Sequence, residues 1–135
     1  MLKRIATSVI LTVFTTSAIA QQQTCAPVTH SAINITSGMT YHEAREKLIQ
    51  AGWQPHRHRD FLDGGDGLYD EAKTFWELGY EEMQYCSGKL LIECTFNFKD
   101  VYNNHLNIVT QGMEYPEEDV FARISEFRFK CNQDP

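Results

Sequence analysis

The residues best suited to chemistry lie in a short run at positions 56–60, His-Arg-His-Arg-Asp. Side chains alternate between the two faces of a β-strand, so His56, His58 and Asp60 would project to the same side if this run is a strand. Two imidazoles and a carboxylate could form a facial metal site, for which zinc or copper is better suited than calcium. The alternative, which short polar runs favour, is an exposed edge strand whose charges discourage pairing with another sheet.

A second group of candidate residues lies in the acidic stretch Glu114–Asp119, which Pro116 interrupts. Protein inhibitors often present such a loop to a basic cleft, where charges at the rim raise the association rate and the specificity. The alternative is an ordinary solvated turn. The candidate partner-binding residues are Tyr115, Glu117, Glu118, Asp119 and Trp53. Tryptophan and tyrosine are enriched at binding hot spots, although Trp53 follows an expected helix end and would be equally suited to a core.

The short motifs of common enzyme classes are missing from the sequence. It contains no G-x-S-x-G, no H-E-x-x-H and no phosphate-binding loop. Carboxylates are plentiful, but nothing in the sequence indicates that two of them converge. We therefore expect a non-catalytic protein that uses no cofactor.

The first twenty residues indicate the compartment. Lys3 and Arg4 precede an apolar stretch over positions 5–14, and the segment ends in an A-x-A pattern with Ala18 and Ala20. This is the layout of a secretory signal peptide, and the apolar stretch is shorter than the ~20 residues of a membrane span. An uncleaved anchor is the alternative. We expect residues 1–20 to be removed and 21–135 to form one periplasmic or secreted domain, without membrane insertion after cleavage.

All four cysteines lie beyond the expected cleavage site. In an oxidising compartment an even number indicates two disulfides, for which three pairings exist. We favour Cys86–Cys94, which would close across a short turn, together with Cys25–Cys131, which would tie down both ends of the mature chain. A metal site is disfavoured because the spacing of Cys86 and Cys94 is wider than in structural zinc sites.

The charge of the chain limits its partners. It has 12 basic and 18 acidic residues, so loss of Lys3 and Arg4 with the signal peptide leaves a net charge of −8. This argues against nucleic acid and against an anionic lipid surface, which both attract basic patches. It is compatible with a basic protein partner, and also with the simpler explanation that charge keeps the protein in solution.

The segments that must position these residues carry helix and strand signals. Thr40 followed by Glu43 is a capping box, and Gly52 is a typical C-terminal cap. The expected helices run over 41–51 and 69–78, and the expected strands over 53–60, 90–98, 105–111 and 121–131. This order predicts an α+β fold: a small antiparallel sheet of three to five strands, one or two helices packed on one face, and two disulfides. We expect a monomer or a weak dimer.

The segment Ser37–Trp53, SGMTYHEAREKLIQAGW, resembles the opening of a PASTA-type module. The matching residues are Gly38, Met39, Thr40, Glu43, Ala44, Leu48, Ala51 and Gly52. A similar helix start occurs in β-lactamase-inhibitor-like domains and in a small barrel-assembly lipoprotein. The resemblance implies a helix ahead of a small sheet, with muropeptide binding or protease-like inhibition as the associated functions. The chain departs from the pattern in its second helix, its expected disulfides and the absence of a tandem copy.

Small size, export, disulfides, acidic charge and missing catalytic motifs together favour a non-catalytic periplasmic binding protein. We expect an inhibitor or immunity-type protein that blocks an envelope-directed enzyme, so its partner would be a protein of the cell envelope. One alternative is a cell-wall (peptidoglycan) ligand-binding module, to which the PASTA-like helix points. The other is metal binding through His56, His58 and Asp60.

Overall fold

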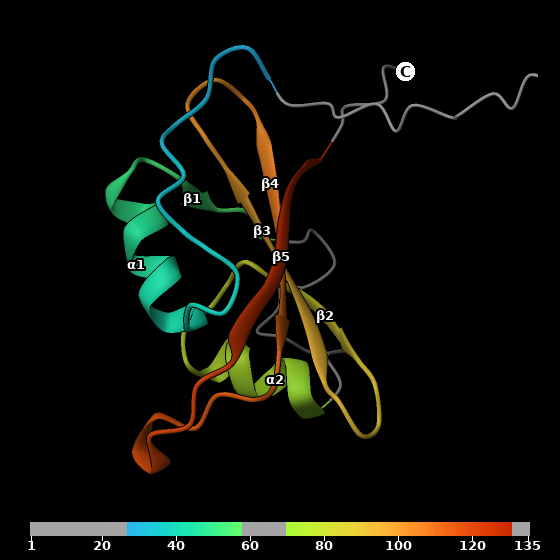
Figure 1. The fold of residues 1–135 in the computed structure, drawn as a ribbon. Helices are drawn as coiled ribbons and strands as arrows, with labels where there is room; N and C mark the ends of the chain where they lie inside the picture. Colours follow the sequence, from blue (N-terminus) through green and yellow to red (C-terminus); the bar gives the residue numbers. More distant parts are fainter. Residues whose placement is uncertain (1–26, 58–69, 131–135) are drawn as a thin grey trace, which may run out of the picture.

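The protein is built on one antiparallel sheet of five strands, seen nearly edge-on in Figure 1. Its strands are β1 (Gln54–Pro55), β2 (Met83–Ser87), β3 (Glu93–Lys99), β4 (His105–Gln111) and β5 (Arg123–Lys130). They are ordered β1-β3-β4-β5, and β2 also pairs with β3. Helices α1 (Tyr41–Gln50) and α2 (Asp70–Glu77) pack on one face, and a 3₁₀ turn η2 (Pro116–Glu118) lies between β4 and β5. The predicted α+β class is confirmed.

The computed structural model describes residues 27–57 and 70–130. Five of the features predicted above lie outside these residues. They are the signal peptide over 1–20, Cys25, His58, Asp60 and Cys131. The predictions that depend on them, including the Cys25–Cys131 disulfide and the metal site, stay predictions.

Helix α1 begins and ends where the sequence places its signals. Thr40 Oγ1 accepts a hydrogen bond from the Glu43 amide at 3.3 Å, which satisfies one of the free N–H groups of the first turn. At the other end Gly52 has φ +97°, a left-handed conformation that suits glycine. The Trp53 amide then returns to the Leu48 carbonyl at 3.0 Å, so the chain leaves the helix in a defined direction.

The strands show why some elements were predicted and others missed. Strand β4 has the predicted bounds, and β3 and β5 lie within about three residues of theirs, because apolar and polar side chains alternate along them. Strand β2 was not predicted. Met83 and Gln84 are both buried, and the register shifts between Met83 and Tyr85, so a bulge breaks the alternation. Of the edge strand predicted over 53–60, only Gln54 and Pro55 pair as β1 in the described residues.

The core lies between the sheet and the two helices. Its largest fully buried apolar side chains are Trp53, Tyr41, Phe75, Phe96, Phe98, Leu48, Met83, Leu106, Ile108 and Ile124. The Tyr41 ring of α1 stacks on Phe96 of β3 with centroids 3.9 Å apart, and Phe75 of α2 meets the same ring edge-on at 5.2 Å. Phe96 therefore joins both helices to the centre of the sheet.

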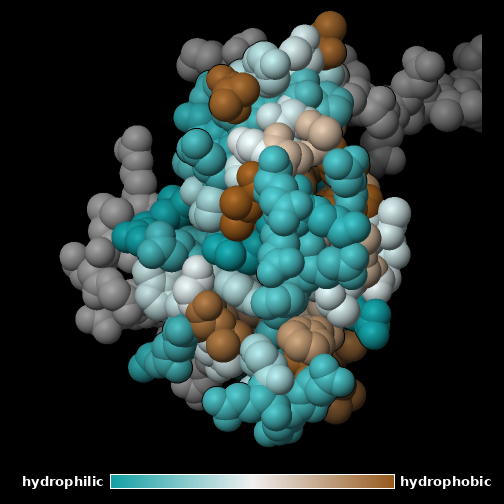
Figure 2. All heavy atoms as spheres, turned by 90° about the vertical axis from the view of Figure 1, so that its left-hand side faces the viewer, coloured by the Kyte–Doolittle hydropathy of each residue, from teal (hydrophilic) through white to brown (hydrophobic). Residues whose placement is uncertain are grey.

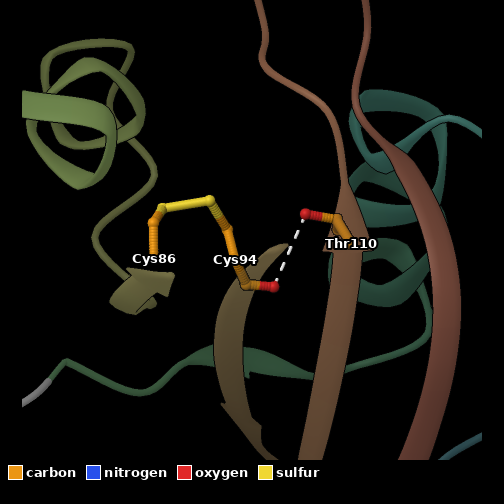
Figure 3. Close-up of a disulfide and its surroundings, with 3 residues drawn as sticks. All are labelled: Cys86, Cys94 and Thr110. Atoms are coloured by element: carbon orange, nitrogen blue, oxygen red, sulfur yellow. Dashed lines mark hydrogen bonds between the residues drawn. A yellow bond between two sulfur atoms is a disulfide. The ribbon is translucent and has the colours of Figure 1, made fainter. Parts of the chain in front are cut away.

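The predicted Cys86–Cys94 disulfide is confirmed (Figure 3). The two cysteines face each other in the register of β2 and β3, with Cα atoms 4.1 Å apart. On the next strand Thr110 Oγ1 donates to the Cys94 carbonyl at 3.5 Å. In the connecting turn Gly88 has φ +104°, and a Cβ there would lie 2.0 Å from the Leu91 carbonyl oxygen. Only glycine leaves room for this turn, which brings the cysteines together.

Candidate functional site

The segment Tyr115–Val120, which we call the acidic loop, projects from the end of the molecule between β4 and β5 (Figure 1). Its two ends are joined by backbone hydrogen bonds. The Tyr115 amide donates to the Val120 carbonyl at 2.8 Å, and the Val120 amide donates to the Tyr115 carbonyl at 3.2 Å. Between them η2 makes one turn, and Asp119 reverses the chain with φ +57°, which aspartate tolerates better than most residues. The loop is thus closed by its own backbone.

The acidic loop exposes carboxylates at its tip and apolar surface at its base. Glu117, Glu118 and Asp119 are exposed, and none of the three forms an ion pair within the described residues. Tyr115 is 43% exposed and Val120 41%. The structure therefore brings together four of the five residues predicted to bind a partner, and it adds Val120, which the sequence did not single out.

Glu114 does not belong to this surface, so the prediction of an acidic binding stretch that begins at Glu114 was wrong for this residue. Its side chain is fully buried, and Oε1 accepts a hydrogen bond from the Tyr80 hydroxyl at 2.9 Å. Its Oε2 is the buried side-chain atom without a hydrogen-bond partner among the described residues. Burial raises the pKa of Glu114, an effect that the Tyr80 hydrogen bond and the nearby His42 oppose in part. Glu114 acts as an anchor at the base of the acidic loop.

A buried polar cluster links this anchor to α1. The Glu82 carboxylate is fully buried and accepts hydrogen bonds from Tyr41 Oη at 2.7 Å and from Arg45 Nε at 2.6 Å. The Arg45 guanidinium lies over the Tyr80 ring, 4.8 Å from its centroid. Tyr80 is therefore held on one side by Arg45 and on the other by its bond to Glu114. Burial, together with the Glu82 charge and hydrogen bond, raises the pKa of Tyr41, so its hydroxyl stays a donor.

The sequence offered no signal for this cluster. Glu82 lies in a segment to which no element was assigned, and its partners Tyr41 and Arg45 are 41 and 37 residues away. Burial raises the pKa of Tyr80 as well, with Glu114 adding to the effect. His42 completes the cluster at the surface, where its Nδ1 lies 3.0 Å from the Tyr80 hydroxyl. In this cluster the buried charges are paired and the tyrosine hydroxyls keep their protons, and the Tyr80–Glu114 bond connects it to the base of the acidic loop.

Trp53 is not a contact residue in this structure, which corrects its place among the predicted partner-binding residues. Its side chain is 1% exposed, and Nε1 donates to the Ala32 carbonyl at 3.0 Å. The ring also meets Phe129 of β5 with centroids 6.2 Å apart. Trp53 follows the helix cap directly, and its side chain points toward the sheet. Burial of its large apolar ring there is more favourable than exposure to water.

The predicted metal ligands are only partly within the described residues. The His56 ring meets the His105 ring edge-on, with centroids 4.7 Å apart. Arg57, which follows His56 in the sequence, forms an ion pair with Glu81, and its guanidinium lies over the Trp76 ring, 5.1 Å from the centroid. Within residues 27–57 and 70–130, no three histidine, cysteine, aspartate or glutamate side chains are grouped to hold a metal ion.

Among the described residues on the side of α1, no broad apolar surface is visible. In the view toward α1, hydrophobic side chains form small separate patches among hydrophilic ones (Figure 2). Neither described helix has the length and apolar character needed to cross a membrane. No protein-family model, no curated protein and no solved structure matches this chain.

Proposed function

We propose that this is an exported, non-catalytic binding protein of the cell envelope, which docks its acidic loop against a basic surface of a protein partner. An inhibitor or immunity-type protein of an envelope enzyme is the form of this function that we favour. The observation that carries the proposal is the backbone closure of the loop between Tyr115 and Val120, whose tip carboxylates form no ion pair with the part of the chain that the structure describes.

Closure matters because ordering a loop on binding costs conformational entropy. Two backbone hydrogen bonds and the Asp119 reversal already hold the loop in one shape, so little of this cost remains. The buried bond from Tyr80 to Glu114 supports the loop from below. A rigid scaffold that presents a polar loop is a common arrangement for binding sites.

The composition of the loop suits a basic partner. Glu117, Glu118 and Asp119 would attract a basic surface from a distance and raise the association rate. Tyr115 and Val120, at the base of the loop, would supply apolar contact once the surfaces meet. Export rests on the expected signal peptide over 1–20, and the confirmed Cys86–Cys94 disulfide is in keeping with an oxidising compartment.

The test is an affinity pull-down with the oxidised protein from periplasmic and envelope extracts, analysed by mass spectrometry. We expect one stoichiometric protein partner, whose binding weakens as salt is added. The variant Glu117→Gln/Glu118→Gln/Asp119→Asn should lower the affinity about tenfold or more through slower association. Asparagine at position 119 keeps the left-handed backbone accessible, so the loop shape is preserved.

A matched control carries the same loss of charge elsewhere. The variant Glu43→Gln/Glu77→Gln/Glu93→Gln removes three exposed carboxylates from α1, α2 and β3. It should bind the partner nearly as well as the unmodified protein. An equal loss of affinity in the two triple variants would mean that the net charge of the protein, and not the acidic loop, drives binding. A blank pull-down with folded protein would contradict the proposal for the proteins in that extract.

A further inference from the structure

The face of the sheet opposite the helices carries a row of basic side chains, two lysines with a histidine between them. In the register of β3, β4 and β5, Lys99 lies opposite His105, and His105 lies opposite Lys130. The intervening residues Phe98 and Leu106 are buried in the core, so the row projects away from the helices. We call this surface the polar face. It consists of this row and the next one, which is formed by Asn97, Asn107 and Arg128.

Like charges that face each other on neighbouring strands reduce the stability of a sheet. Within the described residues neither Lys99, His105 nor Lys130 forms an ion pair that would relieve the repulsion. The pKa of His105 is lowered by burial and then by the charges of His56, Lys99 and Lys130. The lowered pKa favours the neutral form of His105 at pH 7, so the positive field of the row comes from Lys99 and Lys130, on a chain whose net charge is −6.

Two nearby carboxylates weaken this field without cancelling it, and the Asp100 charge raises the pKa of His105 against the lowering by Lys99 and Lys130. Asp100 is engaged in its own turn, where Oδ1 accepts from the amides of Tyr102 and Asn104 and Oδ2 accepts from Ser31. Glu126 lies 3.6 Å from Arg128, but both side chains are more than half exposed. An ion pair of that kind contributes little, and an incoming anion could replace it.

A cavity of about 360 Å³ is hollowed into the polar face. Its lining includes Gln84, Thr95, Asn97, Asn107, Arg128 and Lys130. Gln84 and Thr95 are buried, whereas Arg128 and Lys130 are exposed, so the cationic groups stand at the rim. Asn107 Nδ2 donates to Asn97 Oδ1 at 2.9 Å, which leaves the Asn97 amide nitrogen as a free donor among the described residues. The volume falls in the range of small-molecule sites.

We propose that the polar face binds a small organic or inorganic solute through an oxyanion group, a carboxylate or a phosphate. Arg128 and Lys130 would hold the oxyanion, because a guanidinium can bond two of its oxygens at once and an ammonium adds a point charge. Lys99 adds to the positive field around this site. Asn97 and Asn107 would hydrogen-bond the uncharged part of the ligand.

A small solute is favoured over a polyanion or an anionic membrane. The positive row acts within about 8 Å, the Debye length at physiological ionic strength, whereas an extended anionic surface would also meet the excess of acidic residues. A solute that fits the cavity senses mainly the row and the rim. This site is independent of the acidic loop, so either proposal can fail alone.

The test is a ¹H–¹⁵N NMR titration of the oxidised protein with three probes at constant ionic strength. They are inorganic phosphate, N-acetylmuramic acid and N-acetylglucosamine, the last of which lacks the carboxylate of the second. We expect saturable shifts at the Asn97 and Asn107 side-chain amides with phosphate, with the acidic sugar or with both, and none with the neutral sugar. Phosphate alone would assign a phosphate site, and the acidic sugar alone a carboxylate site.

Two variants sharpen the test. Arg128→Gln/Lys130→Gln should weaken binding roughly tenfold or more, because charge-assisted hydrogen bonds are lost. Glu126→Gln should strengthen it about twofold, because Arg128 is freed from a weak ion pair. The matched control is Lys47→Gln/Lys73→Gln, which removes two exposed charges from the helices and should leave the affinity unchanged.

Three outcomes would overturn the proposal. The first is an equal response to the neutral sugar, and the second is an unchanged affinity in Arg128→Gln/Lys130→Gln. The third is no response to either anion, and cosedimentation of the protein with phosphatidylglycerol vesicles would in that case identify the polar face as a membrane-binding surface. Circular dichroism of each variant establishes that the fold is retained.

Discussion

On the side of the sheet that α1 covers, Arg45 and Glu82 are bonded to each other, and the carboxylate is fully buried. On the opposite side Lys99, His105 and Lys130 stand next to one another without a counter-ion among the described residues. A buried charge must be paired, because removing it from water without a partner is very unfavourable. A charge in contact with water needs no such partner. Basic side chains can therefore lie next to one another on the polar face, where a bound anion would neutralise them.

The largest effect on stability should come from breaking the buried ion pair between Arg45 and Glu82. Replacing Arg45 by methionine keeps most of the apolar stem but leaves the buried Glu82 carboxylate without its cation. We expect the free energy of unfolding to fall by about 3 kcal/mol or more, measured by urea denaturation. Arg45→Lys, which keeps the charge but loses the planar donor group, should cost less.

The control for this variant is Lys47→Met on the same helix. Lys47 forms an exposed pair with Glu43 at 3.3 Å, and such pairs contribute about 0.5 kcal/mol or less. A similar loss of stability in both variants would mean that the Arg45–Glu82 pair is no stronger than a surface pair. The contrast between the two sides of the sheet would then disappear.

An intermediate effect on stability should come from the titration of Glu114 as the pH changes. Its pKa in the folded protein is raised by burial above the ordinary 4.5, so the folded state binds this proton more tightly than the unfolded state. The resulting stability is complete below pH 4.5 and is lost as the pH rises through the folded pKa. A tenfold difference in proton affinity between the folded and unfolded states corresponds to about 1.4 kcal/mol of stability.

The variant Glu114→Gln removes this titration. Between pH 4 and pH 7 the unmodified protein should lose stability relative to the variant, and urea denaturation at several pH values measures the difference. Contributions from other groups, such as Asp100, are common to both proteins and cancel. Glu117→Gln, which neutralises an exposed neighbour, should run parallel to the unmodified protein. Parallel curves for Glu114→Gln would show that the pKa of this carboxyl is the same in the folded and unfolded states.

The smallest effect on stability is expected from a substitution on the polar face. Lys130→Gln removes one of the charges that lower the pKa of His105, so we expect this pKa to rise in an NMR titration. At a pH below the pKa of His105, where the imidazole is charged, loss of this like-charge neighbour should also stabilise the protein by about 0.3 kcal/mol. Lys73→Gln on α2 should change neither value. An unchanged His105 pKa in Lys130→Gln would mean that the row does not act as one field.

The elements that the sequence predicted well are those with local signals. The capping of α1 depends on residues three positions apart, and its end depends on the backbone freedom of Gly52. Strand β4 follows from alternation alone. Strand β2 was missed because its bulge places two buried residues in succession, a pattern that local alternation cannot represent.

The candidate site was predicted in part. Tyr115 and the three carboxylates at 117–119 were recognised as a group because they are adjacent in the sequence. Glu114 was wrongly placed in the same group because it is adjacent in the sequence. Its side chain points inward to the hydroxyl of Tyr80, 34 residues away. Trp53 was open to two interpretations, and only its packing against the sheet decided between them.

The sequence by itself determined the class of fold, the ends of α1 and the pairing of Cys86 with Cys94, because each depends on neighbours along the chain. Only the tertiary structure decided which charges are buried and which stand together on the polar face. Those relations join residues on different strands and helices, and the register of the sheet, not their distance along the chain, brings them into contact.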